Sequence, residues 1–166
     1  MVLHTRRRRA AIWATLAVLG LVAAACSDDG DSGPTAATGA ASGGATTVEV
    51  TVQEFAVLPA ADSAPAGEVT FNVNNTGPED THEFVVFKTE LAPDALPTAS
   101  DGSVDEEGEG VELIDETEEI AVGDTPTLTV SLDAGSYVLI CNIVEDEGDE
   151  TIVHYQQGMR TGFTVD

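Results

Sequence analysis

Short runs in which apolar and polar side chains alternate begin at Thr47 and recur to the C-terminus. Such alternation is typical of strands with one face in a core and the other in water. In the first run, Val48, Val50 and Val52 alternate with polar residues. The later runs cover residues 68–73, 82–87, 127–132, 136–141 and 163–165. Glycine, proline and asparagine separate them, and no long stretch repeats every 3.6 residues, so the sequence predicts an all-β sandwich or barrel over residues 47–166 rather than a helical bundle.

Two acidic stretches do not follow the strand pattern. Residues 98–120 contain ten acidic residues, and residues 144–150 are acidic as well. Because like charges repel one another and favour solvated chain, we interpret both as loops, with one short helical or extended piece near residues 111–114. A dedicated calcium site is the alternative, although no spacing here matches an EF-hand loop.

The N-terminus has the features of an export signal. Residues 1–9 are basic, with arginine at positions 6–9, and residues 10–25 form an apolar run. That run is shorter than the about 20 residues of a membrane-spanning helix, but it suits the apolar region of a secretory signal. We therefore expect residues 1–25 to be a signal peptide, exported by the general secretory or the twin-arginine route.

The end of this segment resembles the lipobox of bacterial lipoproteins, in which a cysteine becomes the lipid-bearing first residue. The sequence is Ala23-Ala24-Ala25-Cys26, with Ala23 where leucine is usual. Residues 26–46 have no large apolar residue after the cysteine and are predicted to be a flexible linker. The resemblance implies an extracytoplasmic protein held at the cell membrane by lipid on Cys26. The alternative is a plain cleavable signal with Cys26 as a spare thiol.

Acidic residues dominate the composition. The chain has 30 acidic and 6 basic residues and a net charge of −24, and only Lys88 and Arg160 are basic beyond residue 25. Nucleic-acid backbones require clustered basic residues, so a nucleic-acid partner is excluded. An anionic membrane would repel this domain, so any membrane attachment must come from the lipid. The acidity either steers a basic partner protein or serves solubility alone.

Few side chains in residues 47–166 can bind a soft metal. They are His82, Cys141, His154 and Met159. Two imidazoles, a thiolate and a thioether are the ligands of a blue-copper electron-transfer site. Taken singly, a cysteine or a methionine is more often a core residue, and a histidine is more often an ordinary polar residue. The order histidine, cysteine, histidine, methionine is what points to copper.

Three segments resemble those of the cupredoxin family of plastocyanin-like and azurin-like proteins. They are residues 81–84, 135–141 and 154–159, and the similarity covers residues 46–166. The resemblance implies a Greek-key sandwich that binds one copper ion through His82, Cys141 and His154, with Met159 as the weak axial ligand. It also implies that Cys141 carries the electron path and that His154, on a loop expected at the surface, is the electron exit.

The chain departs from the family pattern at two places. Twelve residues, 142–153, separate Cys141 from His154, whereas family members usually have only a few. A longer loop can still close, because closure entropy grows slowly with length. Glu83 follows His82 where many members have asparagine, which implies a different set of contacts around the ligands.

These features predict a lipid-anchored type 1 copper protein that carries single electrons between membrane-associated redox partners. One alternative is an extracytoplasmic copper carrier or metallochaperone that uses the same ligands. Another is a cupredoxin-like module with a degenerate metal site. An enzyme is the least expected, because the sequence has no motif such as G-x-S-x-G and no second copper centre.

Overall fold

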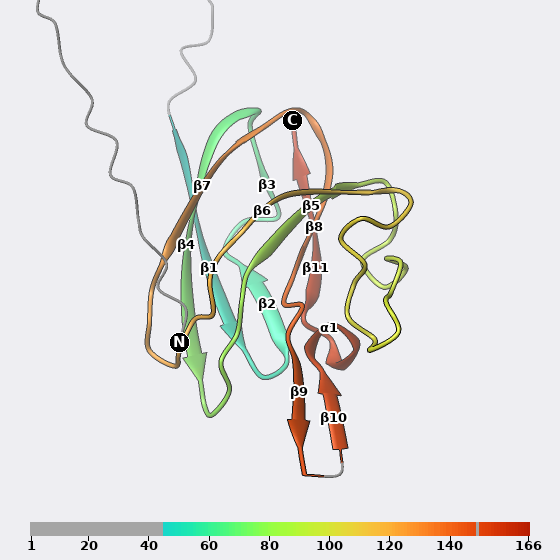
Figure 1. Cartoon of the computed structure of the whole chain (residues 1–166). Helices are drawn as coiled ribbons and strands as arrows, with labels where there is room; N and C mark the ends of the chain where they lie inside the picture. The colour runs from blue at the N-terminus through green and yellow to red at the C-terminus, as the bar shows by residue number, and fades with distance from the viewer. Residues whose placement is uncertain (1–44, 149) are drawn as a thin grey trace, which may run out of the picture. The chain divides into compact units, whose positions relative to one another are not determined.

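The computed structural model describes residues 45–148 and 150–166, whose strands form two main sheets (Figure 1). The first sheet has the order β2 (Ala56–Pro59), β1 (Thr46–Gln53), β4 (Gly67–Gly77) and β7 (Thr127–Leu132). The second has the order β3 (Ser63–Ala64), β11 (Arg160–Val165), β8 (Gly135–Ile140), β5 (Val85–Thr89) and β6 (Val111–Glu116). The fold is therefore the predicted all-β sandwich.

The predicted signal peptide (1–25), Cys26 and the linker up to residue 44 lie outside the described residues. None of the helices within the described part of the chain is long and apolar enough to cross a membrane.

The chain passes repeatedly from one sheet to the other, which gives the Greek-key arrangement. Strand β4 lies in the first sheet, β5 and β6 in the second, β7 in the first again and β8 in the second. Neighbouring strands are antiparallel, except for the parallel pairs β1–β4 and β3–β11. The crossing from β4 to β5 spans residues 78–84, and it carries His82 to one end of the sandwich.

The alternation of side chains places the main core between the sheets. In β1, Val48, Val50 and Val52 are all at most 3% exposed. At the end of β8, Tyr137, Leu139 and Cys141 belong to this core, as their spacing predicts. The intervening residues of β8 belong to a second apolar cluster. Cys141 therefore points into the space between the two sheets.

The second cluster involves the long segment that connects β5 to β6. Leu96 and Val104 of this segment are buried, together with side chains from β5 and β8. The hydroxyl of Tyr155 ties the segment down, because it donates to the carbonyl of Pro93 at 2.8 Å and accepts from the N–H of Leu96 at 3.2 Å. Residues 98–120, which we predicted to be a loop, are thus partly packed against the sandwich. The short extended piece predicted within them is strand β6.

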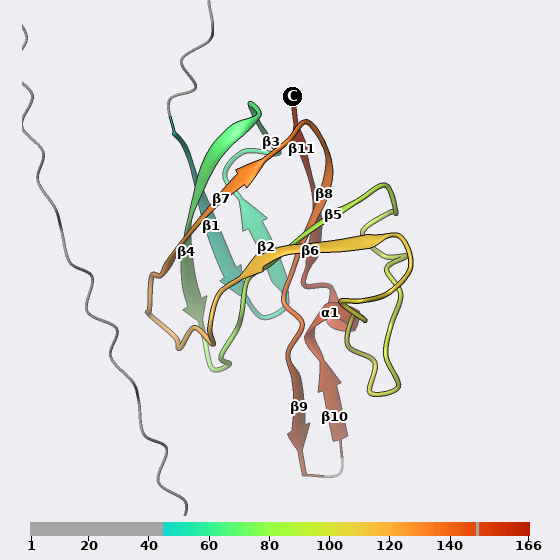
Figure 2. The same ribbon diagram turned by 45° about the horizontal axis from the view of Figure 1, so that its top comes forward.

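The interpretation of residues 144–150 as a loop was wrong. They lie in a hairpin of β9 (Val144–Glu147) and β10 (Glu150–Val153), which projects from the end of the sandwich (Figures 1 and 2). Successive side chains of a strand point to opposite faces, which separates the acidic groups. Val153 is buried and packs with Val144, so apolar contact at the base of the hairpin opposes the charge repulsion.

Phe71 of β4 tests the packing between the sheets. Its ring is fully buried and lies 5.2 Å from the ring of Phe84 and 5.6 Å from that of Phe163. We expect Phe71→Ala to lower the free energy of unfolding by about 3–5 kcal/mol, measured by urea denaturation, because it leaves a cavity between the sheets. Glu68→Ala, an exposed change on the same strand, should alter it by less than about 0.5 kcal/mol. Equal effects would contradict this packing.

Candidate metal centre

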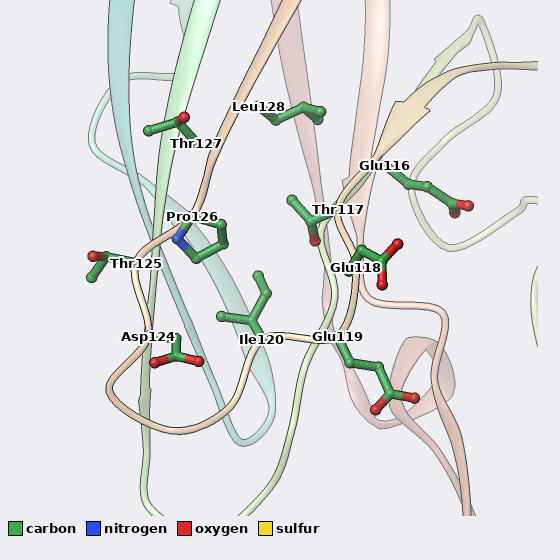
Figure 3. Close-up of a pocket in the computed structure, with 10 residues that line it drawn as sticks. All are labelled: Glu116, Thr117, Glu118, Glu119, Ile120, Asp124, Thr125, Pro126, Thr127 and Leu128. Carbon is green, nitrogen blue, oxygen red and sulfur yellow. The ribbon is translucent and has the colours of Figure 1, made fainter. Parts of the chain in front are cut away.

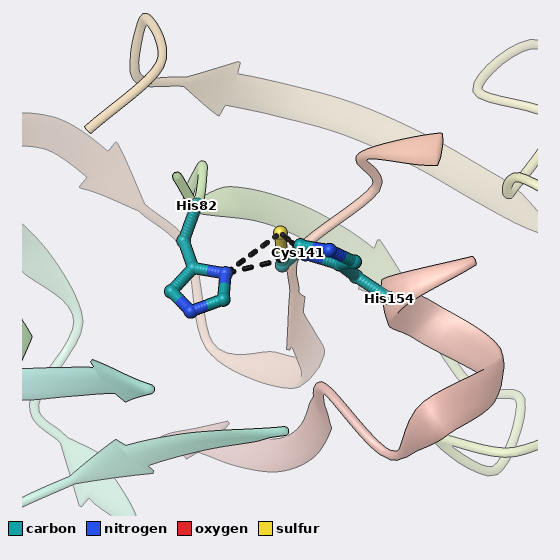
Figure 4. A group of neighbouring side chains, drawn as sticks. All are labelled: His82, Cys141 and His154. Carbon is teal, nitrogen blue, oxygen red and sulfur yellow. Dashed lines mark hydrogen bonds between the residues drawn. The ribbon is translucent and has the colours of Figure 1, made fainter. Parts of the chain in front are cut away.

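Three of the four predicted ligands converge at one end of the sandwich (Figure 4). His82 lies in the β4–β5 crossing, Cys141 directly follows β8, and His154 is the first residue of the short helix α1 (His154–Gln157). The Nδ1 atoms of the two histidines are 3.2 Å apart. The sulfur of Cys141 lies 3.3 Å from Nδ1 of His154 and 4.0 Å from Nδ1 of His82. All three side chains are fully buried, so their donor atoms face one another away from water.

Backbone hydrogen bonds fix these positions. His82 pairs with Ile120, with an N–H···O distance of 3.1 Å in one direction and 2.6 Å in the other. The N–H of Cys141 donates to the carbonyl of Met159 at 3.1 Å, and that of His154 donates to Ile143 at 3.0 Å. The ligands are therefore held by paired main chain rather than by free loops, although twelve residues separate Cys141 from His154.

Met159 lies beside the other predicted ligands. Its side chain is fully buried in the same core cluster as Cys141, and its N–H donates to the carbonyl of His154 at 3.1 Å. Gly158 makes this turn possible, because its φ of 123° lies in a region that other residues rarely adopt. The role of Met159 as an axial ligand stays a prediction.

Glu83 links the two segments that carry His82 and Cys141. Its carboxylate accepts the N–H of Asn142 at 2.9 Å, and its own N–H donates to the sulfur of Cys141 at 3.4 Å. Burial raises the pKa of Glu83 to about 7, against the effect of the hydrogen bond from Asn142. The residue that departs from the family pattern thus still connects the ligand segments, through a carboxyl group instead of an amide.

His154 was expected on a surface loop, but it is the first residue of helix α1 and its side chain is fully buried. The ring of Phe55 meets it edge-on at 5.4 Å, and Glu145 of the hairpin approaches its outer nitrogen. Phe55 lies far from His154 in the sequence, and Glu145 lies among the twelve residues between Cys141 and His154. Both side chains cover the imidazole. Phe55 and Glu145 therefore stand between this imidazole and the solvent.

The thiol and an imidazole have altered proton affinities. Burial raises the pKa of the Cys141 thiol to about 12. Burial, and then the neighbouring His154, lower the pKa of His82. At neutral pH in the metal-free protein, Cys141 is thus a thiol and His82 is a neutral imidazole.

Two carboxylates that the sequence did not single out lie against the outer nitrogens of the histidines. Glu54 Oε1 is 3.9 Å from Nε2 of His82, and Glu145 Oε2 is 3.7 Å from Nε2 of His154. These distances exceed a hydrogen bond, and both Nε2 atoms are buried without a partner. Burial opposes ionisation of Glu54, but the backbone N–H groups of Asp80 and Glu79 keep its pKa below the usual value. Among 30 acidic residues, no local pattern distinguishes these two.

An open hollow lies between residues 116–120 and 124–128 (Figure 3). Its lining includes four carboxylates, of Glu116, Glu118, Glu119 and Asp124, but no histidine or cysteine. The soft donors that copper prefers are therefore elsewhere, in the cluster of Figure 4.

A family model described as a cupredoxin-like domain matches residues 15–153. The chain belongs to this family. The match ends one residue before His154, so the placement of His154 and Met159 in this cupredoxin depends on the structure. No curated protein matches the chain.

Solved structures with similar folds include two auracyanins and a rusticyanin. Reduced auracyanin from Roseiflexus castenholzii is 23% identical over 73% of this chain and 97% of its own, with a TM-score of 0.50. Auracyanin A from Chloroflexus aurantiacus, titled a "blue" copper protein, is 20% identical over 74% and 100%, with a TM-score of 0.49. Rusticyanin from Thiobacillus ferrooxidans is 22% identical over 75% and 79%, with a TM-score of 0.48. At these identities the likeness shows the fold alone.

Copper is the cofactor of this cupredoxin, and the residues present fit it. Imidazole nitrogen suits copper in both oxidation states, and thiolate sulfur is a soft ligand that favours Cu(I). Two buried Nδ1 atoms and one buried sulfur lie within 4.0 Å of one another, with their Nε2 atoms turned outward. His82, Cys141 and His154 would hold the ion.

The thiol pKa of about 12 predicts how copper affinity depends on pH. Binding must displace the proton of Cys141, so affinity for Cu(I) should rise about tenfold per pH unit between about pH 7.5 and 9. Competition with a coloured Cu(I) chelator measures this slope. Cys141→Ser removes the thiol and should flatten it. A flat slope in the unaltered protein would show that Cys141 gives up no proton to copper.

Proposed function

We propose that this cupredoxin is an exported, lipid-anchored blue copper protein that carries single electrons between redox partners at the membrane. The observation that carries the proposal is the convergence of His82, Cys141 and His154 within 4.0 Å, all fully buried. Copper, when bound there, supplies a one-electron couple. The protein holds its ligands and excludes water.

The backbone pairing of the ligands supports electron transfer rather than conversion of a substrate. Main-chain hydrogen bonds hold Cys141 to Met159, and His154 to Ile143. Ligands fixed in this way change position little between two oxidation states. The buried donors also leave no solvent-exposed ligand face for a substrate, and the hollow of Figure 3 lacks soft donors. An electron carrier, not an enzyme, is the role that these features favour.

The redox partner is proposed to be a protein with a basic surface. Phe55 and Glu145 cover His154 and are only partly buried, so the outside of this cover is an approach to the centre that a partner can reach. The net charge of −24 attracts a basic partner and repels an acidic one. The association rate should accordingly fall as salt concentration rises.

A copper carrier is the second candidate function. The hairpin that separates Cys141 from His154 contacts this ligand through Glu145, and the residue before the hairpin, Ile143, accepts a hydrogen bond from the N–H of His154. A hairpin that swings away would take His154 with it and free the ion. Slow loss of copper to a chelator, together with a reversible redox couple, favours the electron carrier; ready transfer favours the metal carrier.

The visible spectrum tests the metal centre. We expect the full chain, purified in detergent and loaded with Cu(II), to show a strong thiolate-to-copper charge-transfer band, because Cys141 supplies the sulfur. Cys141→Ser should abolish the band. Met159→Leu should keep the band and raise the reduction potential, because an axial donor stabilises Cu(II). A colourless unaltered protein would overturn the blue-copper proposal.

Cell fractionation tests the anchor. Cys26→Ala removes the only side chain in the proposed lipobox that could carry lipid. We expect the unaltered chain in the membrane fraction and the variant in the soluble extracytoplasmic fraction, since the acidic domain has no attraction of its own for an anionic membrane. The same distribution for both proteins would contradict lipid anchoring while leaving the copper proposal intact.

A further inference from the structure

A second group of metal-binding side chains lies on the outer side of His154. The ligand atoms of Asp80, Glu145 and His154 lie within 4.8 Å of one another. Asp80 and Glu145 are partly buried, whereas His154 is fully buried. The group therefore has two carboxylates at the solvent boundary and one imidazole beneath them.

The outer nitrogen of His154 points to a ligand that the protein itself does not provide. This Nε2 atom is buried without a hydrogen-bond partner, and Glu145 Oε2 is 3.7 Å away. On the inner side, Nδ1 of His154 lies 3.2 Å from Nδ1 of His82, a distance at which one of the two nitrogens must carry hydrogen. When His154 carries it, its Nε2 has a free lone pair facing the carboxylate of Glu145, with that of Asp80 in the same group. The carboxylate oxygens of Asp80 and Glu145 and Nε2 of His154 then form a group of three electron-pair donors.

The backbone around Asp80 is held in place. The amide of Asn75, which is fully buried, donates to the carbonyl of Asp80 at 2.9 Å. The N–H of Asp80 in turn donates to the carboxylate of Glu54. On the other side of the group, Glu145 pairs with Ile152 in the hairpin. Both carboxylates thus come from ordered segments, so little entropy is lost when they bind an ion.

We propose that Asp80, Glu145 and Nε2 of His154 form a cation site in the copper-free protein, on the opposite side of the His154 ring from the Nδ1 atom that faces His82 and Cys141. One imidazole and two carboxylates suit Zn²⁺ or a similar borderline divalent ion, with water in the open position. Calcium prefers six to eight oxygen ligands, and Cu(I) prefers sulfur, so neither fits this group.

The two sites share one ring, and this couples them. Copper on Nδ1 leaves hydrogen on Nε2, whereas an outer cation needs that Nε2 lone pair. Occupation of either site therefore weakens the other, and by linkage the effect is reciprocal. Zinc at the outer site would act as an antagonist of copper loading without touching Cys141.

Zinc titration of the metal-free full chain tests the proposal. Cys141→Ala serves as background, because it removes the thiol that would otherwise bind Zn²⁺. Calorimetry should detect one Zn²⁺ per chain. Asp80→Asn, Glu145→Gln and His154→Gln should each weaken binding at least about tenfold, or 1.4 kcal/mol. Circular dichroism of each variant verifies that it is folded.

Two matched variants separate the alternatives. Glu150→Gln removes the same charge from an exposed position of the same hairpin, and His82→Gln removes an inner nitrogen only. Glu150→Gln should leave zinc affinity within about threefold, and His82→Gln, which removes the ring whose Nδ1 faces that of His154, should weaken it less than Glu145→Gln does. Zinc binding that depends on His82 but not on Asp80 or Glu145 would place the ion between the inner nitrogens and overturn the proposal. Absence of binding, or an equal loss in Glu150→Gln, would overturn it as well.

The unaltered chain gives an independent readout with Co²⁺. Cobalt at the outer site has no sulfur ligand, so part of the bound cobalt should show no thiolate-to-metal absorption, and Glu145→Gln should remove that part. If all bound cobalt shows the thiolate band and the Cys141→Ala chain binds no cobalt, the outer site does not exist. Neither result depends on electron transfer, so this proposal can fail while the blue-copper proposal stands.

Discussion

The position of Cys141 at the end of β8 is the constraint on which the metal centre depends. The alternation of side chains in β8 turns its sulfur into the space between the sheets, and the hydrogen bond from its N–H to Met159 ties β8 to the segment that carries the last predicted ligand. His82 lies in the crossing between the sheets, and His154 directly follows the hairpin. The positions of both histidines must therefore adapt to that of the sulfur. The sandwich thus sets one ligand rigidly, and the other segments close around it.

The strands and the inward faces were predictable, because they depend on local alternation. The valines of β1 and the triplet Tyr137, Leu139 and Cys141 are buried as their spacing indicates. The candidate ligands could be predicted because residues 47–166 contain only two histidines, one cysteine and one methionine. Their convergence could be expected only from the family resemblance, because it joins residues that lie far apart in the sequence.

The parts that the sequence did not reveal involve contacts between distant segments. Repulsion among acidic residues pointed to a loop at residues 144–150, but the apolar contact of Val144 with Val153 and the strand pairing outweigh it. The burial of His154 requires Phe55, from the turn after β1. Glu83 looked like a loss of the usual asparagine, yet its carboxyl group reaches the neighbour of Cys141. None of these contacts has a periodic or spacing pattern.

The hydroxyl of Tyr155 joins the residue after a metal ligand to Pro93 and Leu96 of the long β5–β6 connection. The same connection reaches the centre again further along, because Val104 and Glu106 hydrogen-bond to Asn142, the residue after Cys141. Insertions or deletions near either attachment would pull on the segments that carry Cys141 and His154. Sequence drift in this connection is thus mechanically coupled to the metal ligands at more than one point along its length.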